Sequence, residues 1–337
     1  MKLIRAELAR LFARRFTRIA LVGVLLLLAG IATVIWITNH KPTPADRLSA
    51  HIAAEQALTE RNAAYQQCVD AQSRTPSPGA TDSGAKQFPP GFDCHQITDY
   101  PSTDADFLPA SFRLAAAGPD LFRALGALLA LFGFAVGASF IGAEWSSGGI
   151  LTLLLWRPNR TPVWLGKLGS LLLGVLGVGV VYSVLWYATL WVLADNRGSN
   201  ALTAGALRSL ALVDVRAIAL ALVAAAVGYA VSALGRNTAT ALGAAVAWVV
   251  IFEVGTRIIL GLMNAARPER WLLSSYVQAW LTNGARFFDE SKCHNGPDPC
   301  VGVWWRISAQ QSALVGVTLL VVVTAVSLYS FRRRDVT

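Results

Sequence analysis

The sequence predicts an all-α membrane protein with six transmembrane helices, an N-terminal amphipathic interfacial helix, and a large outer insert between helices 1 and 2. Of the 337 residues, 54% are hydrophobic and only 15% are charged, whereas roughly 25% of residues in soluble domains are charged. The hydrophobic residues form long runs without the alternation of membrane β-strands. Because backbone amides in hydrocarbon have no water to pair with, these runs must form helices.

Six apolar runs are each long enough to span a bilayer, which takes roughly 18 or more residues. Five have cores without Asp, Glu, Lys or Arg, and the sixth is interrupted only by Glu253 and Arg257. No small-residue cleavage site follows Thr38, so we interpret the first run as a retained anchor and not a signal peptide. Gly133 and Gly137 form one GxxxG pattern, which permits close helix packing but is common by chance. The predicted spanning helices cover residues 19–38, 121–142, 162–194, 213–234, 238–262 and 307–331.

Residues 1–18 are predicted to form an amphipathic helix at the membrane surface. Cations lie on one face of this helix, and the other face is apolar. Two interpretations stay open: the helix only anchors the chain in the inner leaflet, or it also docks to a cytoplasmic partner. The apolar face consists of Leu3, Ile4, Leu8, Leu11, Phe12 and Phe16.

The distribution of charge predicts a multi-pass protein of the cell membrane with both termini in the cytoplasm, because cytoplasmic segments carry the excess of Lys and Arg. With the N-terminus inside, the cytoplasmic segments hold 13 Lys and Arg against three carboxylates, and the remainder holds 16 against 17. The net charge of +9 therefore indicates contact with anionic membrane lipid. It gives no reason to expect a nucleic-acid partner.

The segments outside the spanning helices follow from this topology. Residues 39–120 form the outer insert, in which Pro44–Gln72 is rich in Ala, Glu and Gln and is predicted to be helical, and Ser73–Phe92 is predicted to be a loop. Residues 195–212 and 263–306 are the other outer loops, and residues 332–337 are a cytoplasmic tail. Within the last loop, Trp271–Trp280 is too apolar to be simply solvated, and we interpret it as a re-entrant or interfacial segment.

All four cysteines fall on the outer side, where disulfides can form. We predict the pairs Cys68–Cys94 and Cys293–Cys300 because each pair shares a loop, although three pairings are formally possible. The alternative is a metal site built from the Cys-His neighbours at 94–95 and 293–294, but their spacing is not a known ligand pattern. We therefore expect no metal.

Residues 143–160, between helices 2 and 3, combine features of a short helix at the inner surface. We expect Glu144 to lie at a helix start, where the helix dipole favours a carboxylate. Ile150–Trp156 is apolar but too short to span, Pro158 ends the helix, and Arg160 and Lys167 flank the next spanning helix.

This segment resembles the corresponding part of the ABC-2 type transporter permease family. The family pattern is Glu, a Gly-Thr pair, a Leu-rich helix, and then Pro and Arg before helix 3; Gly149 stands where the family often has Thr. The six-helix layout, the amphipathic start and the long loop before the last helix also match, so the resemblance covers most of the chain. The matching residues are Glu144, Gly148, Leu151, Leu154, Leu155, Pro158 and Arg160.

The resemblance implies that residues 143–160 are a coupling helix that contacts a separate ATPase subunit. Glu144 would be the polar contact, and Arg160 a contact to lipid or partner. The alternatives are a helix cap for Glu144 and an ordinary cytoplasmic cation for Arg160. The resemblance further implies a permease that exports a hydrophobic or amphipathic compound together with a second permease chain, identical or not.

We expect no catalytic site and no cofactor in this chain. A phosphate-binding loop needs GxxxxGK followed by Ser or Thr, but Gly166–Lys167 is followed by Leu168. ATP and Mg would therefore be bound by the partner ATPase.

Glu253 and Arg257 lie one helical turn apart within the fifth spanning helix. An ionisable residue inside the membrane is a functional candidate, but at this spacing the two can also neutralise each other, and we favour an intramembrane ion pair. One alternative function is a proton-coupled secondary transporter that uses Glu253, which would need internal repeats with broken helices. The other is a membrane-anchored signalling or cell-envelope assembly protein that acts through its outer insert.

The topology is tested by cysteine accessibility in intact cells. We expect cysteines introduced beside Pro158 to resist a membrane-impermeant thiol reagent, because that segment is cytoplasmic, and cysteines introduced in residues 39–120 to react. Labelling beside Pro158 from the outside would contradict the predicted topology.

Overall fold

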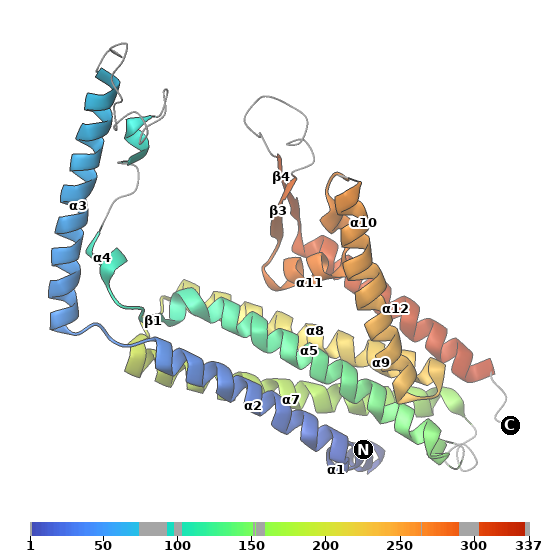
Figure 1. Ribbon diagram of the computed structural model, residues 1–337. Coiled ribbons are helices and arrows are strands. Elements are labelled where there is room, and N and C mark those ends of the chain that lie inside the picture. Colours follow the sequence, from blue (N-terminus) through green and yellow to red (C-terminus); the bar gives the residue numbers. More distant parts are fainter. Residues whose placement is uncertain are drawn as a thin grey trace. The chain divides into compact units, whose positions relative to one another are not determined.

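The computed structural model describes residues 2–73, 93–97, 103–150, 152, 159–263, 265–289 and 303–333. It confirms an all-α membrane protein, because the described residues contain six helices that are long and apolar enough to cross a membrane. Figure 1 shows these helices, which are Arg15–Thr38 (α2), Leu114–Ser146 (α5), Arg160–Arg197 (α7), Ala204–Gly235 (α8), Thr238–Leu262 (α9, η2 and α10) and Ala309–Arg333 (α12).

Shorter elements connect or divide these helices. The fifth spanning helix consists of α9 (Thr238–Ala247), the π-helix η2 (Trp248–Gly255) and α10 (Thr256–Leu262). The remaining helices are α1 (Lys2–Ala13), α3 (Pro44–Ser73), η1 (Cys94–Ile97), α4 (Asp104–Phe107), η3 (Pro268–Trp271) and α11 (Leu273–Leu281). The strands are β1 (Phe112–Arg113), β2 (Gly198–Ser199), β3 (Ala285–Asp289) and β4 (Val303–Ile307).

The chain divides into two compact units. Unit 1 comprises Met1–Thr33, Leu114–Trp191 and Ala201–Thr337, and it contains most of the spanning helices. Unit 2 comprises Val34–Arg113 and Val192–Asn200. Each unit is described by itself below.

Unit 2 is built around α3 (Figure 1). The helix begins with reciprocal hydrogen bonds: the Asp46 carboxylate accepts from the Thr43 backbone N–H at 2.8 Å, and the Thr43 hydroxyl oxygen accepts from the Asp46 N–H at 3.2 Å. This arrangement satisfies two N–H groups that the helix itself leaves unpaired. The hydrogen bonds from Thr43 also lower the pKa of Asp46. Near the other end of α3, a disulfide joins Cys68 to Cys94 of η1, with a Cα–Cα distance of 5.9 Å, so the covalent bond ties η1 to the helix.

Unit 1 has its tightest packing between α5 and α8, which lie side by side along their length (Figure 1). Small residues face each other here at helical spacing: Gly126, Gly133 and Gly137 of α5 meet Ala217, Ala221 and Ala225 of α8. A Cβ added at Gly133 would lie 2.6 Å from the carbonyl oxygen of Ala221. Lipid tails are as apolar as side chains, so close packing must hold membrane helices together, and small residues permit it.

α8 begins well before its apolar core. The side chain of Thr203 caps the helix by accepting a hydrogen bond from the Ala206 N–H at 3.2 Å. Asp214 and Arg216 therefore lie inside α8, where Asp214 accepts a hydrogen bond from the Ser183 hydroxyl of α7 at 2.6 Å. The helical cap, and not the start of the apolar run, sets this helix boundary.

The segment between α10 and α12 contains a feature that the sequence analysis did not predict. β3 and β4 form an antiparallel hairpin in which Phe287 is opposite Trp305 and Phe288 is opposite Trp304. The short helix α11 precedes the hairpin and packs against α8 and α12. Strands of five residues with bulky aromatic pairs are too short to give a clear alternating pattern in the sequence.

The contact between α5 and α8 gives a stability prediction. A Cβ at Gly137 would collide with the backbone of Ala225, whereas a Cβ at Gly177 of α7 would have no atom within 4 Å. We expect Gly137→Ala to lower the free energy of unfolding by about 1–3 kcal/mol through overpacking. The control Gly177→Ala should be neutral or stabilising by up to about 1 kcal/mol. Thermal unfolding of both variants in one detergent measures the difference, and equal melting temperatures would contradict the close contact.

Candidate functional site

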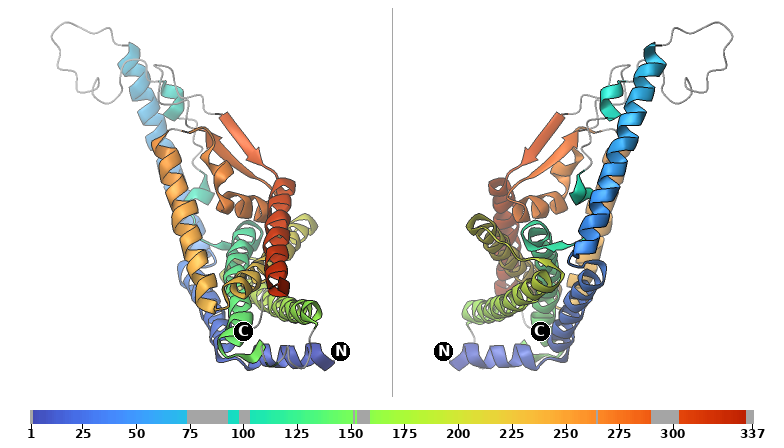
Figure 2. Two further views of the ribbon diagram at one scale, coloured as in Figure 1. Left: turned by 90° about the vertical axis from the view of Figure 1, so that its right-hand side faces the viewer. Right: turned by 90° about the vertical axis from the view of Figure 1, so that its left-hand side faces the viewer.

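Four charged side chains from separate parts of unit 1 meet beside the segment that the sequence singles out. Glu7 belongs to α1, Arg14 joins α1 to α2, Glu144 lies in the last turn of α5, and Lys167 lies near the start of α7. Figure 2 shows α1 lying across the end of unit 1 where these helices meet. We refer to these four residues as the charge cluster.

The carboxylates and cations of the charge cluster alternate. Lys167 Nζ lies 2.7 Å from Glu144 Oε2 and 3.1 Å from Glu7 Oε2. Arg14 Nη2 lies 3.0 Å from Glu144 Oε1, and its Nη1 donates to the carbonyl oxygen of Ser139 at 2.9 Å. Both oxygens of Glu144 are therefore used inside the chain.

The charge cluster is largely removed from water. The exposed fractions of its side chains are 2% for Glu7, 5% for Lys167, 15% for Glu144 and 21% for Arg14. The ring of Phe140 lies beside both cations, 5.0 Å from the Arg14 guanidinium carbon and 5.5 Å from Lys167 Nζ. Burial lowers the pKa of Arg14, and the coulombic effect of Glu144 and Glu7 opposes that shift. Because buried charges are stable only when paired, the four residues fix one arrangement of α1, α5 and α7.

The prediction that Glu144 lies at a helix start is wrong. α5 continues to Ser146, so Glu144 lies near a helix C-terminus, where the helix dipole disfavours a carboxylate. The two cations offset this cost. Gly148 follows with φ +73°, a left-handed conformation that suits glycine and ends helices. Gly148 thus separates α5 from the residues that follow.

The proposed coupling segment is described only in part. Its Thr152 is helical and donates its N–H to the Gly148 carbonyl oxygen at 3.3 Å, while Ile150 is 1% exposed and Thr152 faces outward. Arg160 begins α7 and donates to the carbonyl oxygen of Arg332 at 3.3 Å, beside a cavity of about 260 Å³. Leu151, Leu154, Leu155 and Pro158 lie outside the described residues, so their place in a coupling helix stays a prediction.

The structure gives Glu253 a different partner from the one predicted. Its carboxylate accepts hydrogen bonds from the backbone N–H of Ser274 at 3.0 Å and from the Ser274 hydroxyl at 2.6 Å. Ser274 lies in the first turn of α11, where N–H groups are unpaired and the dipole favours a carboxylate. In the part of the chain that the structure describes, no ion pair joins Glu253 to Arg257. The predicted ion pair is therefore replaced by a contact between the fifth spanning helix and α11.

The structure describes one of the two predicted cysteine pairs. Cys68 and Cys94 form a disulfide, so Cys94 is not available to the alternative two-Cys, two-His metal site. Cys293 and Cys300 lie outside the described residues, and their pairing stays a prediction.

Of the four residues in the charge cluster, the sequence predicts a functional role for Glu144 alone. Glu144 is the only carboxylate in residues 121–194, and Glu7 is the only one in residues 1–18. A lone acidic residue in a cationic or apolar stretch is the signal that could have identified the charge cluster, because such a residue needs a partner.

A comparison with protein families matches most of the chain. The family model described as ABC-2 family transporter protein matches residues 14–336. The search of curated proteins finds no match.

The charge cluster gives a prediction for stability. We expect Glu7→Ala to cost about 3 kcal/mol of unfolding free energy, because it leaves the buried Lys167 with one carboxylate fewer. The control Arg10→Ala should cost less than about 0.5 kcal/mol, because Arg10, which also pairs with Glu7, is 61% exposed and returns little to water when it is removed. The double variant Glu7→Gln/Lys167→Met should recover part of the loss. Equal unfolding temperatures of Glu7→Ala and Arg10→Ala in detergent would contradict the burial of the cluster.

Proposed function

Because the chain belongs to the ABC-2 family of transporter proteins and is thus a membrane-spanning permease subunit of an ABC transporter, we propose that it exports a hydrophobic or amphipathic compound using ATP hydrolysed by a separate subunit. The observation that carries the proposal is the family match over residues 14–336, together with six helices of spanning length. In this proposal two permease chains, identical or not, work with two ATPase subunits, and ATP and Mg are bound by the ATPases.

The proposed topology indicates which end of the permease would meet the ATPase. With both termini in the cytoplasm, the charge cluster and the segment after Gly148 face the ATPase. Closure of the ATPases would shift the helices between inward-open and outward-open states. A hydrophobic or amphipathic substrate fits this arrangement, because it can reach the spanning helices from the bilayer.

We assign energy transmission to the segment around Gly149–Thr152 and to the charge cluster behind it. A force on this segment would reach α5 through the turn at Gly148. Glu144 would pass it to α7 and α1, since its pairs with Lys167 and Arg14 are costly to break in a buried site. The close contact between the glycines of α5 and the alanines of α8 would move α8 together with α5. In this scheme Glu144 positions the segment and does not itself contact the ATPase. This role differs from the polar contact to the ATPase that the family resemblance implies.

The family membership disfavours the two alternative functions. A proton carrier would need a titratable group without fixed partners, but the Glu253 carboxylate is held by Ser274. Among the described residues of unit 2, no feature favours a signalling or envelope-assembly role over a part in transport.

The coupling proposal is tested best at Thr152. Replacing Glu144 would disturb the buried cluster, and a bulky residue at Gly148 would strain its left-handed backbone, so neither change isolates a partner contact. Thr152 is exposed and helical. We expect Thr152→Trp to leave membrane insertion and thermal stability unchanged. We expect the same change to lower the rate of ATP-driven substrate efflux about tenfold, equivalent to about 1.4 kcal/mol of contact energy.

The measurement is ATP hydrolysis and substrate efflux in vesicles that contain the permease with its ATPase. Thr152→Ser is the matched control, because it keeps the hydroxyl and the surface and should transport normally. Normal coupled transport by Thr152→Trp would rule out this face of the segment as the ATPase contact.

A further inference from the structure

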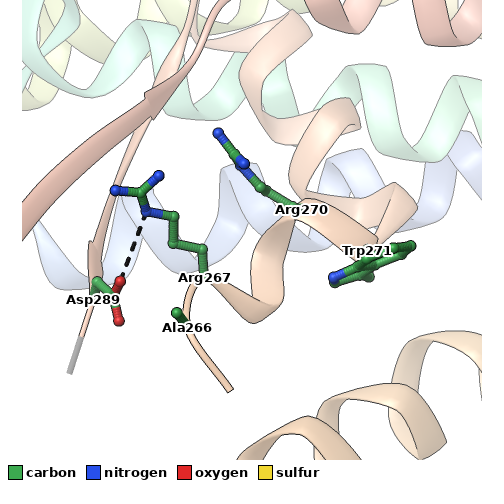
Figure 3. Close-up of a pocket in the computed structure, with 5 residues that line it drawn as sticks. All are labelled: Ala266, Arg267, Arg270, Trp271 and Asp289. Atoms are coloured by element: carbon green, nitrogen blue, oxygen red, sulfur yellow. Dashed lines mark ion pairs between the residues drawn. The ribbon is translucent and has the colours of Figure 1, made fainter. Parts of the chain in front are cut away.

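A second charged region of unit 1 lies between α10 and the β3–β4 hairpin, on the side that the charge distribution predicts to be outside. It surrounds a cavity of about 550 Å³ lined by Ala266, Arg267, Arg270, Trp271 and Asp289. This volume is within the range of about 300–1,000 Å³ that holds small ligands. Figure 3 shows the cavity with the two arginine side chains extending in a similar direction from the η3 region.

Among the described residues that line this cavity, the cations outnumber the carboxylates. Arg267 and Arg270 supply two cations, and Asp289 is the one carboxylate among the lining residues that the structure describes. Asp289 Oδ2 lies 3.7 Å from Arg267 Nε, so the pair is long and engages one edge of the guanidinium (Figure 3). Arg270 lies 5.4 Å from the ring centroid of Trp305. Glu269 lies between the arginines in the chain but does not line the cavity.

Arg267 adopts a backbone conformation that it does not favour. Its φ of 57° and ψ of 56° are left-handed, a conformation that is strained for a non-glycine residue. Residues held in such conformations concentrate at ligand-binding sites. The side chain of Arg267 is 38% exposed, so its guanidinium group is accessible to a ligand from solvent.

One lining residue of the cavity is a strongly exposed apolar side chain, because Trp271 is 74% exposed. Leu262 at the end of α10 and Met263 directly after it, which precede the cavity residues in the chain, are 81% and 71% exposed. Tryptophan and arginine at the end of a spanning helix are typical of the membrane–water interface. A ligand in this cavity would therefore meet cations on one side and the hydrocarbon boundary on the other.

We propose that this cavity binds the phosphate or carboxylate headgroup of an anionic amphiphile in the adjacent membrane leaflet. The planar guanidinium groups of Arg267 and Arg270 suit paired hydrogen bonds to such headgroup oxygens. Trp271 packs against the apolar part of the amphiphile next to its headgroup. The proposal is independent of transport, because it concerns binding to the permease chain alone.

The experiment is native mass spectrometry of the purified full-length chain in detergent, with an equal mixture of dioleoyl phosphatidic acid and dioleoyl phosphatidylcholine. We expect the wild-type chain to retain the anionic lipid about tenfold more than the zwitterionic one, which corresponds to about 1.4 kcal/mol. Equal retention of the two lipids by the wild-type chain would overturn the proposal, whatever the variants do.

Two further comparisons locate the site and identify the ligand. Arg270→Gln should remove most of the preference, whereas Arg286→Gln, the same charge change at an exposed β3 arginine outside the cavity, should keep it. Equal losses in the two variants would show an attraction to overall charge and overturn the site. Millimolar inorganic phosphate should not displace the lipid. Displacement would identify a site for free anions and overturn the amphiphile.

Discussion

The lack of water in the bilayer core is the constraint on which the rest of this structure depends. It forces the backbone into helices, because each amide must find its partner within the chain. It also removes the hydrophobic driving force between helices, so that α5 and α8 associate through glycine and alanine residues that let their backbones approach, as at Gly133 and Ala221. Polar groups inside this region must be paired, as Asp214 is with Ser183 and Glu253 with Ser274.

The same constraint explains why the charge cluster can act as a mechanical connection. A buried carboxylate that loses its partner is far more costly than one that returns to water, so Glu7 and Glu144 hold Lys167 and Arg14 in one arrangement. α1, α5 and α7 are therefore fixed together at the end of unit 1, and α8 follows α5 through backbone contact. The turn at Gly148 joins this fixed group to the segment that we assign to the ATPase. A contact at Thr152 would thus act on four helices at once.

The sequence predicts those parts of the molecule that depend on neighbouring residues. The spanning helices follow from continuous apolar runs, and the Cys68–Cys94 pair follows from a shared loop. The charge cluster could not be predicted in the same way, because its members come from residues 7, 14, 144 and 167 and meet only after the helices pack. The boundaries of α5 and α8 were also missed, because hydrogen bonds such as the Thr203 cap continue a helix beyond its apolar core. Ser274 became the partner of Glu253 because α11 brings its unpaired N–H groups to the carboxylate.

The two charged regions of unit 1 differ in how their charges are balanced, and this difference separates a structural role from a binding role. In the charge cluster two carboxylates face two cations, Glu7 is 2% exposed and Lys167 is 5% exposed, so a ligand would have to break existing pairs to enter. Among the described residues that line the Arg267–Arg270 cavity, the cations outnumber the carboxylate, and Trp271 is 74% exposed. In the proposal an added anion there would gain hydrogen bonds from the two guanidinium groups, and the ion pair described at this site, between Asp289 and Arg267, is 3.7 Å long. The buried cluster therefore holds helices together, while the open cavity has the exposure and the cations that the proposed headgroup needs.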